Sequence, residues 1–190
     1  PEYPLAEYQP HQGRFPGPAP PSFETAALPT PAAAQPASVA TEALRELGAT
    51  WCRESEGSSR AVAVGGRALD ALATLSGART VRLAELAPAG ALALMAWTAA
   101  SGGAHGRRRG MAAGRFEAWW CAATLAGLEE GWPPEPALLG AALDHLHWYQ
   151  WDPDAAAHGD ARGWICRLAV YDPRLGRAWA LDAGDRARGT

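Results

Sequence analysis

The residues best suited to chemistry lie in one short stretch, where a loop rich in glycine and arginine precedes a long apolar helix pattern. Residues 101–110 read SGGAHGRRRG. Such a loop at a helix N-terminus offers unpaired N–H groups and the positive end of the helix dipole to an anion. Arg107, Arg108 and Arg109 add charge, and Arg115 lies about two turns further on. The pattern is typical of a solvated surface loop, and the alternative is a site for a phosphate-bearing ligand.

This stretch is not a phosphate loop of the Gly-Lys-Ser/Thr type, because the chain contains no lysine. The absence of lysine also excludes Schiff-base chemistry. Cys52, Cys121 and Cys166 are widely spaced and form no Cys-x-x-Cys pair, which fits a reducing cytosol. Asp182 and Asp185 could do acid–base work or simply end a strand. We therefore assign no catalytic residue and no cofactor, and leave open whether the chain is an enzyme.

A second polar cluster could ligate a metal ion. Its members are Asp144, His145, His147, Asp152, Asp154, His158 and Asp160. If a helix persists through His147, then His145 and His147 point about 200° apart and cannot share an ion, whereas an extended chain would allow it. Neither His-Glu-x-x-His nor a cysteine–histidine zinc spacing is present. No metal ligand is assigned.

Charge and hydropathy limit the partners. The formal net charge is −3, which disfavours a nucleic-acid partner because such binding needs a basic excess. No run of about twenty apolar residues predicts a membrane span, and no signal-peptide pattern is visible. We therefore expect a cytoplasmic protein without a membrane segment, and the oligomeric state stays open.

The N-terminal residues 1–36 form a proline-rich arm that holds ten of the sixteen prolines. Proline at this density prevents helix formation and favours extended, polyproline-like chain. Tyr3, Tyr8, Phe15 and Phe23 are spaced like anchors along it. We expect this arm either to wrap its own domain or to dock on another protein through these side chains.

Residues 37–190 are expected to form a single α+β domain with a helical centre and β-hairpins. Apolar periodicity predicts helices at 38–48, 67–76, 88–101, 109–126 and 137–151. Alternation predicts strands at 50–55, 60–66, 78–86, 164–171 and 177–182. The first two strands are expected to form one hairpin and the last two another.

The tryptophans of the C-terminal half are expected to build an aromatic core between the last helices and the C-terminal hairpin. They are Trp119, Trp120, Trp132, Trp148, Trp151, Trp164 and Trp179. The alternative is a surface that stacks on a base, a sugar or a partner's proline, for which Trp148, Tyr149 and Trp151 are the candidates.

Two motif groups carry a family resemblance. Residues 106–120 read GRRRGMAAGRFEAWW, and Trp148-Tyr149-x-Trp151-Asp152 leads to the segments RLAVYDP and RAWALDAGDRA. Over roughly the last 90 residues the chain resembles an uncharacterised actinobacterial family, a domain of unknown function. The resemblance implies a bacterial source and supplies no catalytic residue.

The sequence predicts a non-catalytic component that binds another protein, as an accessory or immunity-type part of a bacterial conflict or defence system. The proline-rich arm and the surplus of tryptophan motivate this hypothesis. The alternative is a protein or enzyme that binds a phosphate-bearing ligand, such as a nucleotide, through the arginine-rich loop.

Overall fold

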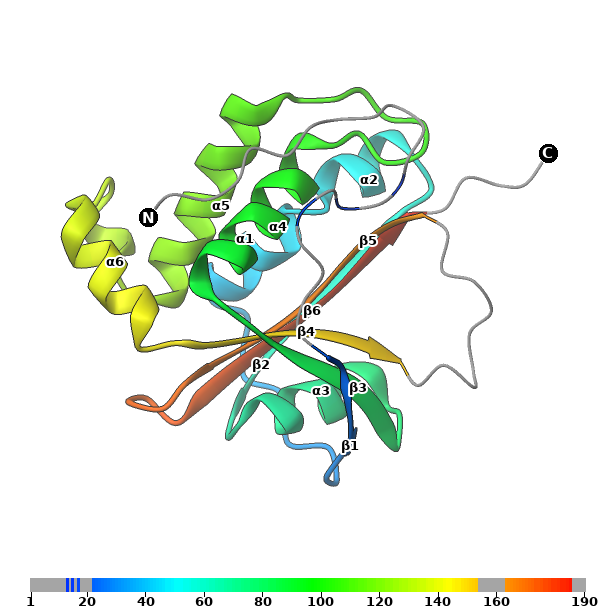
Figure 1. Cartoon of the computed structure of the whole chain (residues 1–190), viewed down its shortest axis with the longest axis vertical. Helices are drawn as coiled ribbons and strands as arrows, with labels where there is room; N and C mark the ends of the chain where they lie inside the picture. The colour runs from blue at the N-terminus through cyan, green and yellow to red at the C-terminus, as the bar shows by residue number, and fades with distance from the viewer. Residues whose placement is uncertain (1–12, 14, 16, 18–21, 154–162, 186–190) are drawn as a thin grey trace.

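The computed structural model describes residues 13, 15, 17, 22–153 and 163–185. These residues build one antiparallel sheet of six strands in the order β1-β3-β4-β5-β6-β2. The strands are β1 (Glu24–Ala27), β2 (Ser58–Gly65), β3 (Thr80–Leu86), β4 (His147–Pro153), β5 (Trp164–Asp172) and β6 (Arg177–Asp185). Four strands that follow one another along the chain, β3 to β6, lie side by side, and the two N-terminal strands close opposite edges (Figure 1).

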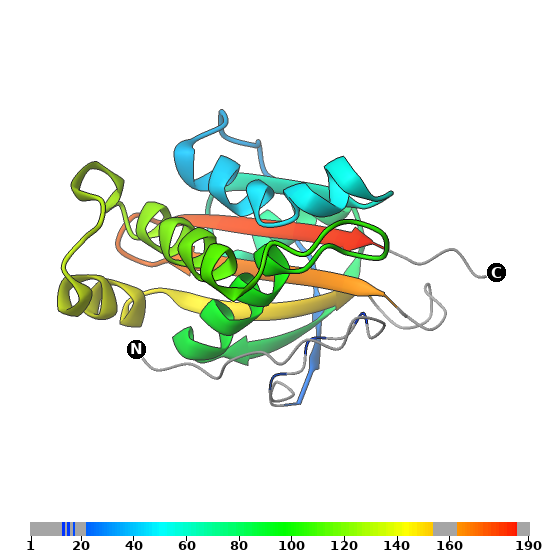
Figure 2. The ribbon, with the colours of Figure 1, turned by 90° about the horizontal axis from the view of Figure 1, so that it is seen from above.

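Helices cover the two faces of this sheet unequally. The helices are α1 (Val39–Glu46), α2 (Ala49–Glu54), α3 (Ala68–Ser76), α4 (Pro88–Ala100), α5 (Met111–Leu125), the short 3-10 helix η1 (Glu129–Gly131) and α6 (Pro136–Asp144). α1, α2, α4 and α5 lie over one face, as the view from above shows (Figure 2). Of the described helices, α3 alone packs on the opposite face, against β2, β5 and β6. The predicted α+β class is confirmed.

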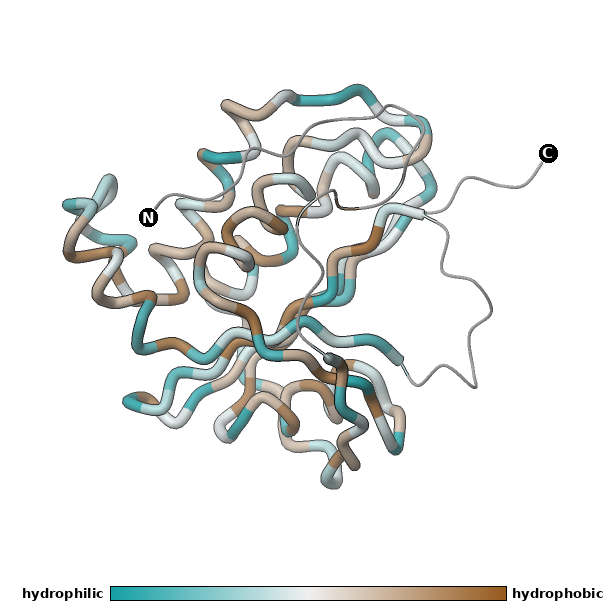
Figure 3. Tube along the Cα trace, in the orientation of Figure 1, coloured by the Kyte–Doolittle hydropathy of each residue, from teal (hydrophilic) through white to brown (hydrophobic). Residues whose placement is uncertain are grey.

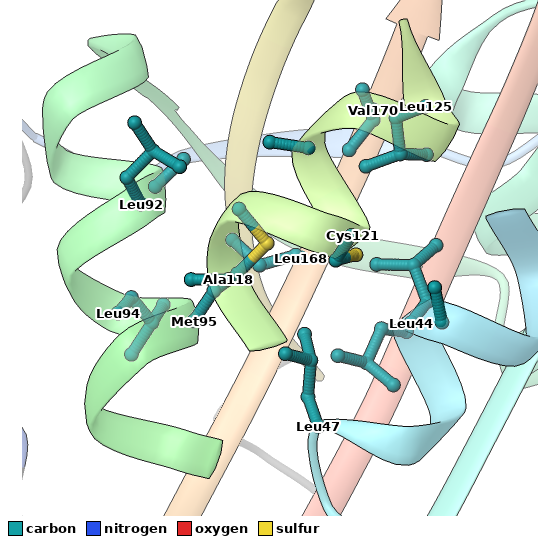
Figure 4. Packing of buried hydrophobic residues seen from close by; sticks show 14 of the residues in the cluster. Leu44, Leu47, Leu92, Leu94, Met95, Ala118, Cys121, Leu125, Leu168 and Val170 are labelled. Carbon is teal, nitrogen blue, oxygen red and sulfur yellow. The ribbon is translucent and has the colours of Figure 1, made fainter. Parts of the chain in front are cut away.

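The larger core lies between the sheet and the helices α1, α4 and α5. Leu44 from α1, Met95 from α4 and Cys121 from α5 converge on Leu168 and Val170 of β5 (Figure 4). α4 is buried over its whole length from Ala91 onward, as its continuous apolar pattern predicts. The hydropathy tube shows hydrophobic stretches within these helices and hydrophilic residues in the loop that joins α4 to α5 (Figure 3).

The smaller core lies under α3. Leu72 and Leu75 of that helix meet Val64 of β2, Ala180 of β6 and Trp151 of β4. Trp148, three residues before Trp151 on the same strand, belongs to the larger core, because successive side chains of a strand point to opposite faces. The expected tryptophan core is therefore divided between the two faces.

Local signals in the sequence set several boundaries correctly. Ser38 caps α1 by accepting a hydrogen bond from the Thr41 amide. Gly77 ends α3 in the left-handed conformation, at φ 63°. Pro88 and Pro136 occupy the first positions of α4 and α6. At this position the missing N–H of proline costs no hydrogen bond within the helix. The C-terminal hairpin of β5 and β6 also forms as predicted.

Two predicted elements are wrong. Residues 50–55 do not form a strand of a hairpin, because Ala49–Glu54 is the helix α2, and the partner of β2 is β6. The helix predicted at 137–151 ends at Asp144, and His147–Pro153 is β4. Tryptophan and tyrosine favour strands. Here the segment that contains Trp148, Tyr149 and Trp151 pairs with β3 on one side and with β5 on the other. The sheet consequently has more strands than the sequence predicts.

The second half of the predicted arm joins the domain. β1 pairs antiparallel with β3, from Glu24 opposite Leu83 to Ala27 opposite Thr80. Further along, the Gln35 amide donates to the carbonyl of Ala63. Residues 22–36 thus run from one edge of the sheet to the other, as an integral part of the fold.

Candidate functional site

The glycine-rich loop leaves α4 at Ser101 and enters α5 after Gly110 through a compact turn. The Gly106 amide donates to the Gly102 carbonyl over 2.9 Å. A Cβ atom at Gly102 would overlap that turn. Gly103 and Gly110 take positive φ values of 68° and 85°, which favour glycine. The spacing of the glycines therefore reflects the backbone path of the loop.

Two amides of this loop donate hydrogen bonds to carboxylates of the same chain. The Ala104 amide donates to Asp185 Oδ2 at 2.6 Å, and the Arg107 amide donates to Glu54 Oε2 at 2.8 Å. Asp185 ends β6 and is 2% exposed. Its other oxygen, Oδ1, is buried and has no hydrogen-bond partner among the described residues. The loop is thus held to the sheet and to α2 by two carboxylates.

The four predicted anion-binding arginines lie along the outer side of this loop and the first turns of α5. Arg107, Arg108 and Arg109 are exposed, and Arg115 is half-buried. Arg109 is paired with Glu117 of α5, over 3.0 Å between Nη2 and Oε1. The four arginines therefore lie at the surface of the protein. Arg107, Arg108 and Arg109 belong to a loop whose backbone is held by Asp185 and Glu54.

The arm side chains that the structure describes contact their own domain. The Phe15 ring packs edge-on against Trp97 of α4, with the ring centroids 5.8 Å apart. The guanidinium carbon of Arg82 in β3 lies 5.1 Å from the centroid of the Phe23 ring. Tyr3 and Tyr8 lie outside the described residues, so their partner-binding role stays a prediction.

An aromatic surface, which the sequence did not single out, lies on α5 beside η1, where Phe116 is exposed and Trp120 and Trp132 are partly buried against the larger core. It consists of Phe116, Trp120 and Trp132. Phe116 and Trp120 lie one turn apart on the same side of α5, and both contact Trp132, with centroid distances of 5.7 and 5.3 Å and ring planes at 87°. Phe116 is 55% exposed, and Leu138 of α6 is 54% exposed.

A ladder of alternating charges crosses five strands and also escaped the sequence analysis. Arg60 of β2 pairs with Asp182 of β6 at 3.0 Å, and Asp182 pairs with Arg167 of β5 at 2.9 Å. Arg167 then reaches Asp152 of β4 at 3.3 Å, and Asp152 pairs with Arg82 of β3 at 3.1 Å. Each of its five charged groups pairs with at least one group of opposite sign, and the three arginines outnumber the two aspartates. Only the strand register could have revealed it, since Arg60, Asp182 and Arg167 occupy directly opposed positions.

The two carboxylates predicted at the end of the last strand do not form a pair. Asp182 lies on the face that α3 partly covers, within the charge ladder. Asp185, an odd number of residues further on, points to the helix-covered face and binds the loop. Their separation on opposite faces removes the paired arrangement that acid–base work would need.

None of the three cysteines is activated. Burial raises the pKa of Cys121 well above its usual value and that of Cys166 to about 12. Cys52 is exposed, and partial burial followed by the charge of Glu46 raises the pKa of its thiol. A thiol of raised pKa is a poor nucleophile at neutral pH, because the thiolate is the reactive form.

The polar cluster proposed for metal binding is dispersed. Asp144 ends α6, His147 begins β4 and stacks on Tyr171, and Asp152 belongs to the charge ladder. Within the ranges that the structure covers, no three His, Cys, Asp or Glu side chains come together as a metal site. Asp154, His158 and Asp160 lie outside those ranges. No helix among the described residues is long and apolar enough to cross a membrane.

Comparison with known proteins places the chain by family alone. No curated protein and no solved structure matches it. One family model matches residues 1–187, so the match includes the proline-rich segment as well as the C-terminal motifs that carry the resemblance. The actinobacterial origin stays a prediction. The chain belongs to the DUF6183 family, which is described as a family of unknown function.

Proposed function

We propose that this chain is a non-catalytic component that binds another protein, and that it does so through the aromatic surface of Phe116, Trp120 and Trp132, of which Phe116 is the exposed member. The observation that carries the proposal is the exposure of Phe116, at 55%, beside two further aromatic rings. Phe116 is a large apolar side chain left open to solvent on top of two rings that are themselves partly buried, which offers a partner an anchor on a firm base. Tryptophan and other aromatic residues dominate the binding energy of protein interfaces.

The neighbourhood of the surface also suits an interface. Leu138 and Ala137 of α6 are exposed next to a proline-containing turn, and the acidic residues Glu130 and Glu135 flank Trp132 along the chain. An apolar centre with a polar rim is the usual arrangement of a specific interface. The accessory role in a bacterial conflict or defence system stays a prediction, which the identity of the partner would test.

The test is a capture experiment with matched surface variants of the full chain. Phe116→Arg places a charge at the centre of the aromatic surface. Leu175→Arg is the control, because Leu175 is 63% exposed in the turn between β5 and β6. Loss of a stoichiometric partner with Phe116→Arg alone, and a dissociation constant at least about 30-fold weaker for that variant by calorimetry, would support the proposal. Equal retention by both variants would refute it.

A second candidate function is the binding of a phosphate-bearing ligand through Arg107, Arg108, Arg109 and Arg115. It is favoured by the exposure of the three consecutive arginines on a loop whose backbone is already fixed. Because carboxylates occupy two loop amides, the guanidinium groups would supply the contacts. Titration with inorganic pyrophosphate, compared between the parent chain and an Arg107→Ala/Arg108→Ala variant, tests this function. Equal heats for the two proteins would exclude it.

A further inference from the structure

We propose that the aromatic surface of Phe116, Trp120 and Trp132 recognises an arginine side chain of a basic partner protein, and that the carboxylate of Glu129 selects for its charge. This inference rests on the proposed function, since it uses the same surface and names the chemistry of the partner. It depends on three observations, which are the charge of the surrounding chain, an unsatisfied carboxylate oxygen and the exposed ring of Phe116.

The chain around the aromatic surface is acidic. Residues 116–146 contain five acidic residues, and none of the 17 arginines of the protein falls within them. Arg109 compensates the charge of Glu117 through their ion pair at 3.0 Å, whereas Glu130 and Glu135 are exposed between α5 and α6. Complementary charges across an interface steer association and suppress wrong partners. The excess of negative charge therefore selects a partner with basic residues.

Glu129 lies beside Trp132 and carries an unsatisfied oxygen. The Trp132 amide donates to the Glu129 carbonyl over 3.3 Å and closes the 3-10 turn of η1, and side chains three positions apart in such a turn lie on the same side. Glu129 Oε2 is buried and has no hydrogen-bond partner among the described residues. Burial of a carboxylate oxygen without a donor is unfavourable. A guanidinium group that approaches this carboxylate compensates its charge.

The rings beside this carboxylate favour arginine over lysine and over apolar side chains. Phe116 is 55% exposed, and its ring packs at 87° to the ring of Trp132. A guanidinium group stacks on aromatic rings and donates two parallel N–H groups to a carboxylate, whereas the compact ammonium group of lysine has no such planar fork. An apolar side chain would cover the rings but leave the carboxylate of Glu129 uncompensated. Arginine therefore matches both the rings and the carboxylate.

The aromatic surface is formed before a partner binds. Trp132 packs edge-on against Trp120 with ring centroids 5.3 Å apart, and both rings pack against the larger core. Because these rings are already ordered, binding costs little of their side-chain entropy. A short peptide can therefore serve as the probe of the site.

Titration of the full chain with two designed peptides tests the preference for arginine. The probe is the short amidated peptide ALRALRA, and its counterpart carries citrulline, the uncharged isostere of arginine, at both arginine positions. NMR signals of the Trp132 indole N–H and of the amides of residues 129–132 report binding. The arginine peptide should bind at least about tenfold more tightly than the citrulline peptide, and about 0.5 M NaCl should reduce that ratio. Equal binding of the two peptides, or binding of neither, would overturn the arginine site.

Matched variants separate this inference from the proposed function. Glu129→Gln keeps the shape of the side chain and should reduce the preference for arginine to within about twofold, because the charge is gone. Glu24→Gln is the control, since Glu24 is exposed on β1, and it should keep the full preference. Phe116→Ala should weaken both peptides. If Phe116→Ala weakens both peptides and Glu129→Gln changes neither, the surface binds protein segments as proposed and the selection of arginine is refuted.

Sedimentation of the parent chain tests a second copy as the source of the arginine. The chain should stay at a single association state over the concentrations used for the titration. A dimer that dissociates in about 0.5 M NaCl and is lost in Glu129→Gln would assign the arginine to a second copy of the chain and would overturn the basic partner protein.

Discussion

The two faces of the sheet bury their polar groups in different ways. The helix-covered face seats the carboxylate of Asp185 at 2% exposure against a backbone amide. The opposite face, under the single helix α3, leaves the side chain of Asp182 23% exposed between Arg60 and Arg167. On the helix-covered face, the buried carboxylate of Asp185 holds a loop by a hydrogen bond. On the face under α3, Asp182 stays partly solvated within ion pairs. The number of helices that cover each face accounts for the difference, because burial removes the water that makes ion pairs weak.

The largest expected effect tests whether the face under α3 is an independent unit of stability. Leu72 is fully buried there, so Leu72→Ala should lower the free energy of unfolding by about 3 kcal/mol through lost contacts and a residual cavity. Leu69, partly exposed in the same helix, is the control, and Leu69→Ala should cost less than about 1 kcal/mol. Urea denaturation measures both values.

Hydrogen exchange of the Leu72→Ala variant sharpens this comparison. Amides of α3 should exchange faster than those of α4 and α5, because α3 is the only described helix on its face and contacts none of the others closely. Equal acceleration in α3, α4 and α5 would show that the two faces unfold together.

The next effect concerns how closely α4 and α5 approach on the helix-covered face. A Cβ atom at Gly114 would overlap the Ala96 carbonyl oxygen and the Ala100 side chain. Gly114→Ala should destabilise the protein by about 2 kcal/mol through overpacking, although alanine is the better helix former. The melting temperature should fall by roughly 4–8 °C.

The matched control for that variant is Gly140→Ala in α6. A Cβ atom at Gly140 meets no atom within 4 Å, so this substitution should stabilise the protein by up to about 1 kcal/mol. Stabilisation by both substitutions would mean that α4 and α5 can separate at little cost, and that the helix-covered face is less tightly packed than the structure shows.

The smallest effects compare the two carboxylates of β6 directly. Asp185→Ala leaves the Ala104 amide without its acceptor and should cost about 1–2 kcal/mol. Asp182→Ala should cost about 0.5–1 kcal/mol, because Arg167 keeps Asp152 and Arg60 is largely exposed.

Salt distinguishes the ion pairs of Asp182 from the hydrogen bond that Asp185 accepts. In 1 M NaCl the cost of Asp182→Ala should shrink, since screening has already weakened its ion pairs, whereas the cost of Asp185→Ala should persist. Chemical denaturation with urea at low and high salt measures both. A salt-sensitive Asp185→Ala variant would indicate that its carboxylate acts through long-range charge rather than through the amide of Ala104.

The glycine- and arginine-rich loop shows how far the sequence could predict a site. The pattern predicted a glycine-rich loop before a helix, and the structure shows that two amides of this loop donate to carboxylates of the same chain; the binding of a phosphate-bearing ligand there stays a prediction. The pattern could not indicate that Asp185, which lies 81 positions from Ala104, supplies one of those carboxylates. The aromatic surface was equally hidden, because only the structure shows that Trp132 packs on both Phe116 and Trp120.

Side-chain periodicity, caps and turn residues determined the elements whose backbone hydrogen bonds are made between residues close in sequence. They located α1, α3, α4, α5 and the hairpin of β5 and β6, because each of those elements satisfies its own backbone or that of its neighbour in sequence. Ser38, Gly77 and Pro88 mark boundaries for the same reason.

Only the tertiary structure decided the identity of α2 and β4, the division of the tryptophans between two faces, and the charge ladder. Each of these depends on a partner that is distant in sequence. The pairing of β2 with β6 leaves residues 49–54 free to be a helix, and the pairings of β4 with β3 and β5 make residues 147–153 a strand. Short amphipathic segments satisfy either period about equally well, so the neighbours that complete their hydrogen bonds and bury their apolar side decide between helix and strand.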